Sequence, residues 1–331
     1  MERLARNIGF FGREGQDRLS DAQVVVVGCG GLGTHVVQQL AYLGVKDFTL
    51  IDHEDLDETN KNRYVTAWAS DPAPGSPKVE LARRHIRLVN PSARVAAIRS
   101  ELRSRAAFEA VMSAEHVFGC LDNDGARLVL TELCAAYRRP YLDLATEIVP
   151  GERPIYGGRV FAAWGGNGCL VCRQLLDLVE ARKDLEDNAA RQDRANLYGV
   201  AFTALEGSGP SVVSINGVVA SLAVTEFSVA VAGLRRPHTL LTYRADLGRV
   251  TVTGDAAPAD CYYCKEVFGT GDAAGVDRYL PSELVHHVSE GGAACRFVTP
   301  SATLLSLNKV GNGRRQVGRL RSKKSELTGE D

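Results

Sequence analysis

Short, unbroken hydrophobic runs alternate with longer amphipathic segments through the first 145 residues of the chain. A strand that is covered on both faces is apolar at every position, so each short run predicts a buried strand of a parallel sheet. The amphipathic segments around these runs have the spacing of crossover helices. The expected strands are 24–27, 47–51, 93–98, 116–121 and 140–144, and the expected helices are 3–19, 34–42, 78–88, 106–112 and 127–137.

This alternation predicts an α/β fold with a Rossmann-like, doubly wound and mostly parallel sheet, whose ligands bind at the carboxyl ends of the strands. Later apolar runs at 157–162, 239–243 and 250–252 predict antiparallel strands that extend the sheet. The long apolar stretch 212–234 contains Asn216 and Glu226, so we expect a buried core helix and not a membrane span. The highly charged segment 173–196 is expected to be a mobile linker or helix.

Composition and charge exclude some classes of function. Of the 331 residues, 45% are hydrophobic and 24% are charged, which is ordinary for a globular protein. The net charge of −1 gives no general electrostatic reason to bind nucleic acid or a membrane. The first twenty residues are charged and contain glycine, so we expect a cytoplasmic location and no signal peptide. We divide the chain into an N-terminal helical arm (1–20), a main domain (21–265) and a C-terminal extension (266–331) with a basic, flexible tail.

A glycine cluster follows the first expected strand, with the sequence Gly28-Cys29-Gly30-Gly31-Leu32-Gly33. A turn of this kind between a strand and a helix presents backbone N–H groups and the positive end of the helix dipole, which can hold a phosphate. The motif alone is compatible with NAD, FAD, a methyl donor or ATP. The chain has no G-x-x-x-x-G-K-[ST] motif, so it is not an ordinary P-loop NTPase.

Charged residues after the glycine cluster narrow the choice of ligand. Asp52 ends the second strand, nineteen residues after Gly33, where such a unit places a carboxylate that binds ribose; its alternative role is to cap the turn. Arg63, three residues after Asn60, and Lys78, at the start of a helix, come next. An enzyme that splits ATP needs fixed cations, because its transition state spreads negative charge over several oxygens, whereas a nicotinamide dehydrogenase does not. Taken singly, each cation is more simply explained as a solvated surface residue.

Two further groups suit metal ions. Asp122 follows the fourth strand, where a carboxylate can hold Mg²⁺ together with substrate phosphates, or else cap the next helix. Cys169 and Cys172, like Cys261 and Cys264, have C-x-x-C spacing. Four thiolates form a closed tetrahedral Zn²⁺ site, so this zinc would be structural and would join distant segments. The alternative is two redox pairs or chance spacing.

As a set, these motifs resemble those of the ThiF/MoeB/HesA-type adenylyltransferases, relatives of the ubiquitin-activating enzymes. The resemblance covers about residues 3 to 265. It rests on the valine-rich strand with its glycine cluster, a D-x-D-like Asp52-His53-Glu54, an S-N-L-x-R-Q-like Thr59–Tyr64, a G-x-P-K at Gly75–Lys78, a C-x-D-N at Cys120–Asn123, both cysteine pairs, a G-x-x-x-S-L-x-A-x-E-like helix at Gly217–Glu226, and an R-Q-like Arg6-Asn7.

The resemblance implies an enzyme that uses ATP to adenylate the C-terminal glycine carboxylate of a ubiquitin-like or sulfur-carrier protein, with release of pyrophosphate. A conjugating enzyme or sulfur donor would act downstream, and residues 21–265 would form the adenylation domain. Arg6 would reach the ATP site of a second subunit, which implies a homodimer joined through the N-terminal arm. The other implied roles are nucleotide contact by Gly28, Gly30, Gly31 and Gly33, ribose binding by Asp52, phosphate contact by Asn60, Arg63 and Lys78, and Mg²⁺ binding by Asp122, beside Asn123.

The chain also departs from the family pattern. Glu54, Thr59 and Tyr64 replace Asp, Ser and Gln, which are mild changes. A larger departure is that segment 173–221 has no cysteine, whereas many relatives carry one there that forms a thioester. We therefore expect adenylation without an enzyme thioester on that segment, with Cys295 and Ser208 as lesser candidates for a transfer residue. Two alternatives stay open: adenylation of a short peptide, and a regulatory subunit that has lost catalysis.

Overall fold

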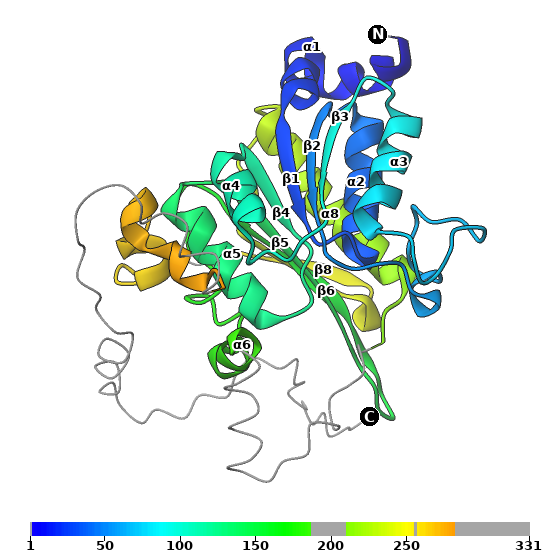
Figure 1. Cartoon of the computed structure of the whole chain (residues 1–331). Helices are drawn as coiled ribbons and strands as arrows, with labels where there is room; N and C mark the ends of the chain where they lie inside the picture. Colours follow the sequence, from blue (N-terminus) through cyan, green and yellow to red (C-terminus); the bar gives the residue numbers. More distant parts are fainter. Residues whose placement is uncertain (1, 187–209, 255–256, 282–331) are drawn as a thin grey trace, which may run out of the picture. The chain divides into compact units, whose positions relative to one another are not determined.

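A single mixed sheet organises the described part of the protein. The computed structural model describes residues 2–186, 210–254 and 257–281. Within these residues the sheet has eight strands in the order β3-β2-β1-β4-β5-β6-β7-β8 (Figure 1). Ser208, Cys295 and the basic tail, about which the sequence makes predictions, lie outside the described residues.

The sheet is parallel in its first half and antiparallel in its second. The parallel strands are β1 (Gln23–Val27), β2 (Asp47–Ile51), β3 (Arg94–Ile98), β4 (His116–Gly119) and the first part of β5 (Tyr141–Val149). The antiparallel strands are β6 (Ile155–Ala163), β7 (Leu240–Arg244) and β8 (Arg249–Thr253). The predicted fold class, a doubly wound parallel sheet with antiparallel additions, is therefore confirmed.

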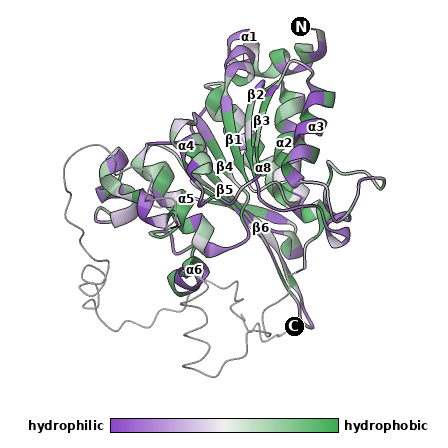
Figure 2. Cartoon of the chain, in the orientation of Figure 1, coloured by the Kyte–Doolittle hydropathy of each residue, from purple (hydrophilic) through white to green (hydrophobic). Residues whose placement is uncertain are grey.

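Helices cover both faces of the sheet, and two separate hydrophobic clusters fill the layers between (Figure 2). The first cluster lies under α1 (Ala5–Asp21), α2 (Gly31–Leu43), α3 (Lys78–Val89) and α8 (Val213–Val231). The second lies under α4 (Arg105–Ser113) and α5 (Asp124–Ala136), and α6 (Leu178–Leu185) packs against α5.

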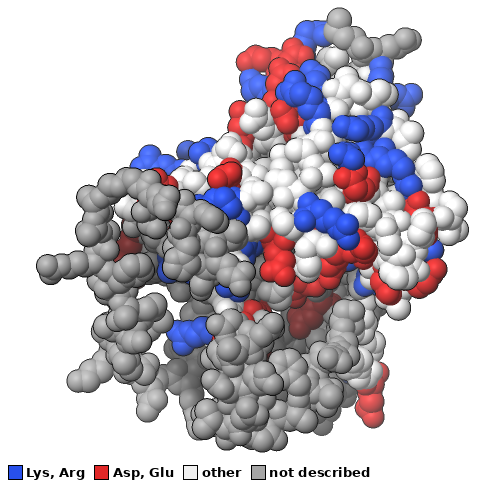
Figure 3. Space-filling model, viewed as in Figure 1, with Lys and Arg blue, Asp and Glu red and all other residues white. Residues whose placement is uncertain are grey.

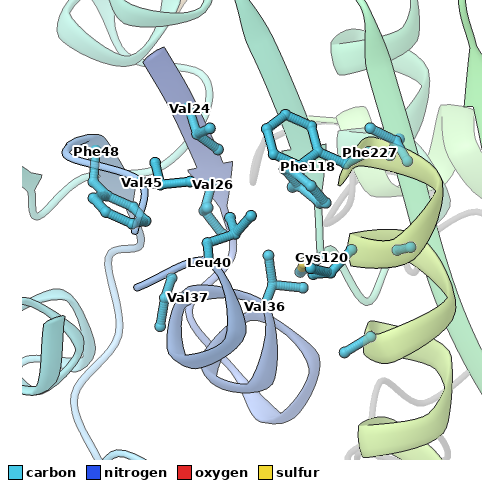
Figure 4. Close-up of a cluster of buried hydrophobic side chains, with 14 of the residues drawn as sticks. Val24, Val26, Val36, Val37, Leu40, Val45, Phe48, Phe118, Cys120 and Phe227 are labelled. Atoms are coloured by element: carbon cyan, nitrogen blue, oxygen red, sulfur yellow. The ribbon is translucent and has the colours of Figure 1, made fainter. Parts of the chain in front are cut away.

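The central strand β1 shows why its hydrophobic run is unbroken. Val24 and Val26 point into the first cluster, and Val25 and Val27 point into the second. Figure 4 shows Val24 and Val26 against three fully buried side chains of α2, with Phe118 of β4 and Phe227 of α8 beside them. Each buried aliphatic or aromatic side chain stabilises the fold by about 1.5–3 kcal/mol.

The apolar helix α8 is part of this core. Among the described residues it is the one helix long and apolar enough to cross a membrane. It packs along α2, β5 and β6, and it buries Asn216 and Glu226, the polar residues that the sequence analysis noted in this stretch. Both polar side chains have partners, because Asn216 accepts a hydrogen bond from Thr146 and Glu226 is paired with Arg235. This packing is that of the core helix predicted from the sequence.

Two segments differ clearly from the prediction. The fifth strand was expected to end at residue 144, but β5 continues to Val149 because β6 pairs with it along its whole length. The charged segment after residue 173 contains α6, whose first N–H groups are capped by Asp177. Asp184 of α6 also accepts a hydrogen bond from the N–H of Gly125, so this part of the segment is a helix packed on α5. The hydrophobic pattern of the sequence gave little sign of this helix, since half of the residues of α6 are charged.

The carboxylate of Glu226 is buried and anchored from two sides. Arg235 donates to both of its oxygens at 2.7 and 2.8 Å, and the N–H of His238 donates at 2.7 Å. Burial opposes ionisation, but these donors outweigh it and hold the pKa of Glu226 below its ordinary value. The stabilisation is therefore present above the ordinary glutamate pKa of about 4.3 and is lost as the pH falls through the lower pKa of the folded protein.

We predict that Glu226→Gln lowers the free energy of unfolding by about 1–3 kcal/mol at pH 7, because the buried side chain loses its charge-assisted hydrogen bonds with Arg235 and with the N–H of His238. The difference from the wild type should shrink in a strongly acidic buffer, below the lowered pKa of Glu226, where the wild-type carboxyl is itself protonated. Urea unfolding at the two pH values measures this. Glu14→Gln, which breaks an exposed pair with Arg18, should leave stability nearly unchanged. An equal loss at both pH values would show that the charge of Glu226 is not what stabilises the fold.

Candidate active site

The turn between β1 and α2 depends on two close backbone approaches. Gly28 has φ +91°, and a Cβ there would lie 2.5 Å from the carbonyl oxygen of Cys120. A Cβ on Gly33 would lie 2.0 Å from the carbonyl oxygen of Gly28, so α2 can approach the strand only with glycine at this position. Gly30 precedes α2 and caps it without a side-chain hydrogen bond, which leaves the first N–H groups of the helix available to an anion.

Asp52 supports this turn from the end of β2. Its carboxylate accepts hydrogen bonds from the N–H of Cys29 at 2.7 Å and from the N–H of Glu54 at 2.8 Å. Burial raises the pKa of Asp52 above its ordinary value, although both donors and Lys78 act in the opposite direction. Asp52 thus caps the turn, as one interpretation of the sequence expected. Each of its oxygens keeps a second lone pair, so ribose binding stays a prediction.

A cavity of about 950 Å³ opens at the carboxyl ends of the parallel strands, where ligands bind in this class of fold. Most of the residues that the sequence singled out line it: Gly28, Gly30, Gly31, Asp52, Asn60, Arg63, Lys78, Asp122 and Asn123. Two of the residues that the resemblance assigns to the ATP site do not line it. Gly33 lies behind the turn within α2, and Arg6 lies on the exposed side of α1.

The two predicted cations come from different elements and share the cavity. Lys78 is the first residue of α3, and its side chain, 8% exposed, forms an ion pair with Glu54 through the ammonium group. The side chain of Arg63 passes over Gly31 and donates to the carbonyl oxygen of Thr59 at 2.6 Å. Both charges are therefore fixed beside the glycine turn, within reach of an anionic ligand.

The loop that carries Asn60 and Arg63 is held in place by its own contacts. Asn60 ends η2 (Glu58–Asn60) and completes a capping box with Asp57. Further along, Asp71 accepts two hydrogen bonds from Arg84 of α3 at 2.6 and 2.7 Å. These bonds lower the pKa of Asp71, so the loop is pinned to α3 by a charged pair at neutral pH.

Asp122 presents a carboxylate to the cavity. It is exposed, and its carboxylate accepts a hydrogen bond from the side-chain amide of Asn123 at 3.2 Å. The residue that caps α5 is Asn123, which accepts from the N–H of Ala126 at 2.8 Å. Asp122 is therefore not the helix cap that the alternative interpretation of the sequence proposed, and its oxygens are available to a cation.

The sequence analysis missed Arg127, which also lines the cavity. It lies on α5, is 5% exposed, and bonds the buried carboxylate of Asp143. A signal was available, because an arginine in the apolar run of a predicted core helix must be paired to be buried. Its partner Asp143 sits inside a predicted strand, so only the folded chain brings the two together.

The four cysteines of the two C-x-x-C pairs converge, as predicted. All four sulfur atoms lie within 4.8 Å of one another. Sγ of Cys169 is 3.7 Å from Sγ of Cys261, and Sγ of Cys172 is 3.9 Å from Sγ of Cys264. These distances exclude disulfides and match the edges of a sulfur tetrahedron around Zn²⁺, which are about 3.8 Å for Zn–S bonds of 2.3 Å. The cluster could hold a structural zinc ion that joins the segment after β6 to the segment after β8.

Comparison with known proteins now identifies the family. Residues 4–261 match the model of the ThiF family. The chain belongs to the ThiF family. It is 30% identical over 201 residues to the protein HesA, vegetative, of Trichormus variabilis, in an alignment that covers 54% of this chain and 75% of that protein.

Other relatives carry the name of adenylyltransferase. The ThiF-family protein is 33% identical over 146 residues to the molybdopterin-synthase adenylyltransferase of Salmonella typhimurium, covering 44% of this chain and 58% of that one. It is 31% identical over 129 residues to the sulfur carrier protein ThiS adenylyltransferase of Escherichia coli, covering 39% and 51%. Its fold resembles that of E. coli MccB, solved with AMPCPP and SeMet MccA, with a TM-score of 0.61, 20% identity, and coverage of 79% and 73%.

We predict that Gly28→Ala lowers the free energy of unfolding by roughly 2 kcal/mol or more, since it forces both a positive φ and a clash with the Cys120 carbonyl oxygen. Gly30→Ala is the matched control, because its Cβ would meet open space and its φ is −78°. Thermal unfolding measures both. Equal stability of the two variants would contradict this account of the turn.

We also predict that Cys264→Ser removes bound zinc and lowers the melting temperature, as chelation would, because structural zinc binds only to a complete ligand set. Metal analysis and thermal unfolding test this. Cys134→Ala removes a buried thiol outside the cluster and should keep one zinc per chain. Zinc-free wild-type protein with an unchanged melting temperature would exclude a structural metal.

Proposed function

We propose that this ThiF-family protein is an ATP-dependent adenylyltransferase that activates the C-terminal glycine carboxylate of a ubiquitin-like or sulfur-carrier protein. Relatives that are named adenylyltransferases support adenylyl transfer in general. The observation that carries the proposal is the convergence of Arg63, Lys78 and Asp122 around one cavity floored by the glycine turn. Such a site neutralises the charge of a reacting triphosphate.

In the proposed complex, each wall of the cavity has one task. The glycine turn and the start of α2 approach the phosphates, and Asp52 binds the ribose hydroxyls. Asn60, Arg63 and Lys78 donate to phosphate oxygens. Mg²⁺, held by Asp122, would neutralise phosphate charge.

The proposed reaction needs alignment more than acid–base chemistry. A carboxylate oxygen of the substrate attacks the α-phosphorus of ATP, and the bond from that phosphorus to the bridging oxygen breaks. Pyrophosphate leaves with the electron pair, and the product is an acyl-adenylate. The attacking carboxylate is already ionised at neutral pH, so no general base is required. Arg63 and Lys78 stabilise charge that develops on the phosphate oxygens.

We further propose that the activated acyl group does not pass to a cysteine near the cavity. Cys120 lines the cavity wall, and Cys29 lies in the glycine turn. Burial raises the pKa of both thiols far above the usual range, so neither supplies the thiolate that a thioester requires. This supports direct transfer from the adenylate to an acceptor.

We propose a homodimer in which Arg6 completes the ATP site of the partner subunit. The support is a groove of about 380 Å³ between α1, α2 and α8, lined by Phe11 and Val229. Phe10 and Tyr42, which also line it, are 65% and 61% exposed, and Arg6 lies on the same helix as Phe10. Exposed aromatic side chains beside a groove, here mixed with polar residues such as Gln38 and Gln39, favour a surface that a second protein chain covers.

The same proposal includes the predicted domain organisation of the chain, the kind of partner that it binds and its location in the cell. Residues 1–20 would be the dimer arm and 21–265 the adenylation domain. Acidic and basic side chains are mixed on the described surface visible in Figure 3, in line with the near-zero net charge. This favours a specific protein partner over a nucleic acid or membrane. A cytoplasmic setting with a downstream sulfur donor or conjugating enzyme completes the proposal.

We predict that Lys78→Ala lowers carrier-dependent ATP–pyrophosphate exchange by roughly 100-fold or more, because the transition state loses a fixed cation. The assay uses a ubiquitin-like sulfur carrier that ends in glycine, and the same carrier without its last residue. Lys61→Ala is the matched control, since Lys61 lies in the same loop, pairs with Glu58 and does not line the cavity. Wild-type exchange in Lys78→Ala would contradict the assigned role.

The outcomes separate the alternatives. Exchange with a free C-terminal peptide but not with the folded carrier would favour the peptide-activating enzyme. Binding of Mg-ATP without exchange, or failure to bind it, would favour a regulatory subunit.

We predict that Arg6→Ala and Asp122→Ala proteins are each inactive and regain exchange activity when their subunits are mixed. A mixed dimer has one site with an intact Asp122 and an intact Arg6 from the partner, so about a quarter of the sites should work under random assortment. Exchange in the mixture measures this. No recovery would place Arg6 in its own subunit's site or outside catalysis.

A further inference from the structure

Arg127 occupies the point where two neighbouring strands separate. β4 and β5 pair only from Val117 and Tyr141 to Gly119 and Asp143. Beyond this point β5 continues to Val149 paired with β6 alone, as the long hairpin in Figure 1 shows, while the residues after β4, Cys120 to Asp122, line the cavity. The carbonyl groups on the facing edges therefore have no ladder partner and require another donor.

Nη2 of Arg127 supplies that donor for both edges. It donates to the carbonyl oxygen of Leu121, next to the end of β4, and to that of Leu144 in β5 at 3.1 Å. One guanidinium nitrogen thus bridges the diverging strands in place of the missing ladder bonds.

The other side of the same guanidinium is anchored in the core. Nη1 donates to both oxygens of Asp143 at 2.8 and 2.7 Å, and this carboxylate is fully buried. Tyr141 also donates to Asp143 at 2.9 Å, and a nitrogen of Arg159 lies 3.4 Å from it. A planar group with several fixed donors can satisfy a carboxylate and two carbonyls at once, which a lysine ammonium cannot do in this geometry.

One of the two bridged carbonyl groups, that of Leu121, belongs to the residue just before Asp122. Asp122 is exposed, and its side chain accepts a hydrogen bond from its neighbour Asn123. Its position is therefore set by the backbone on either side. Asn123 is fixed as the cap of α5, and Leu121 is fixed by Arg127.

We propose that Arg127 is a positioning residue that holds Asp122 in place for a Mg²⁺-bound nucleotide. This inference rests on the proposed function for the task of Asp122, and it adds a residue that acts through the backbone without touching the substrate. Displacement of a catalytic group by about 1 Å can cost roughly 100-fold in rate, so loss of the bridge should impair the metal-dependent step strongly.

The test compares Arg127→Lys with Arg159→Lys. Arg159 faces the same carboxylate and donates to the carbonyl of Leu175 at 3.0 Å, but it bonds neither Leu121 nor Leu144. ATP binding is titrated at a series of Mg²⁺ concentrations, and thermal unfolding is recorded for each variant. Arg127→Gln keeps an amide NH₂ group but removes the charged, planar guanidinium, and it provides a second variant of the site.

Both Arg127 variants should need roughly tenfold more Mg²⁺ for half-maximal ATP binding, whereas Arg159→Lys should stay within about twofold of the wild type. The effect should also disappear in an Asp122→Asn background, since coupled residues are not additive. Wild-type Mg²⁺ dependence in a folded Arg127 variant, the same shift in Arg159→Lys, or additivity with Asp122→Asn would overturn the proposal. Absence of carrier-dependent exchange would contradict the proposed function instead, because the Mg²⁺ titration does not use the carrier.

Discussion

The described structure depends on the backbone contact between Gly33 and the carbonyl oxygen of Gly28. A Cβ at Gly33 would lie only 2.0 Å from that oxygen, so the contact sets how closely α2 can approach β1. The turn between them then faces Cys120 at the end of β4 on one side, and Asn216 of α8 beside Gly31 on the other. The cavity opens where these elements meet, and its floor is backbone at Gly28 and Gly31, where a Cβ would lie 2.5 Å from a neighbouring atom.

Buried charges shape the rim of that cavity more than they stabilise the fold. Asp52 fixes the glycine turn, and Asp143 anchors Arg127. Burying such pairs offsets much of their attraction with lost hydration, so their net stabilisation is small. Their geometric effect is large, because each carboxylate orients several donors at once. The cavity therefore has a rigid floor, and exposed groups that are free to bind a ligand, such as the carboxylate of Asp122, lie around it.

Some residues could be predicted from the sequence because their function depends on local position. Strand-end residues such as Asp52 and Asp122 meet at one edge of any parallel sheet, so their order along the chain was enough to place them together. The two C-x-x-C pairs carry metal-ligand spacing in themselves. Arg127 and α6 could not be placed in this way, because Arg127 finds Asp143 only across two elements and α6 has little hydrophobic periodicity.

The sequence by itself determined most of the strands and helices, the parallel half of the sheet, the glycine turn, many of the cavity residues and the pairing of the cysteine knuckles. Each of these follows from patterns that span a few residues or from the fixed polarity of a parallel sheet. The tertiary structure decided that Glu54 pairs with Lys78 and that Arg127 bridges β4 and β5. These contacts depend on distances between elements far apart in the chain, which only close packing of the whole sheet and its helices sets.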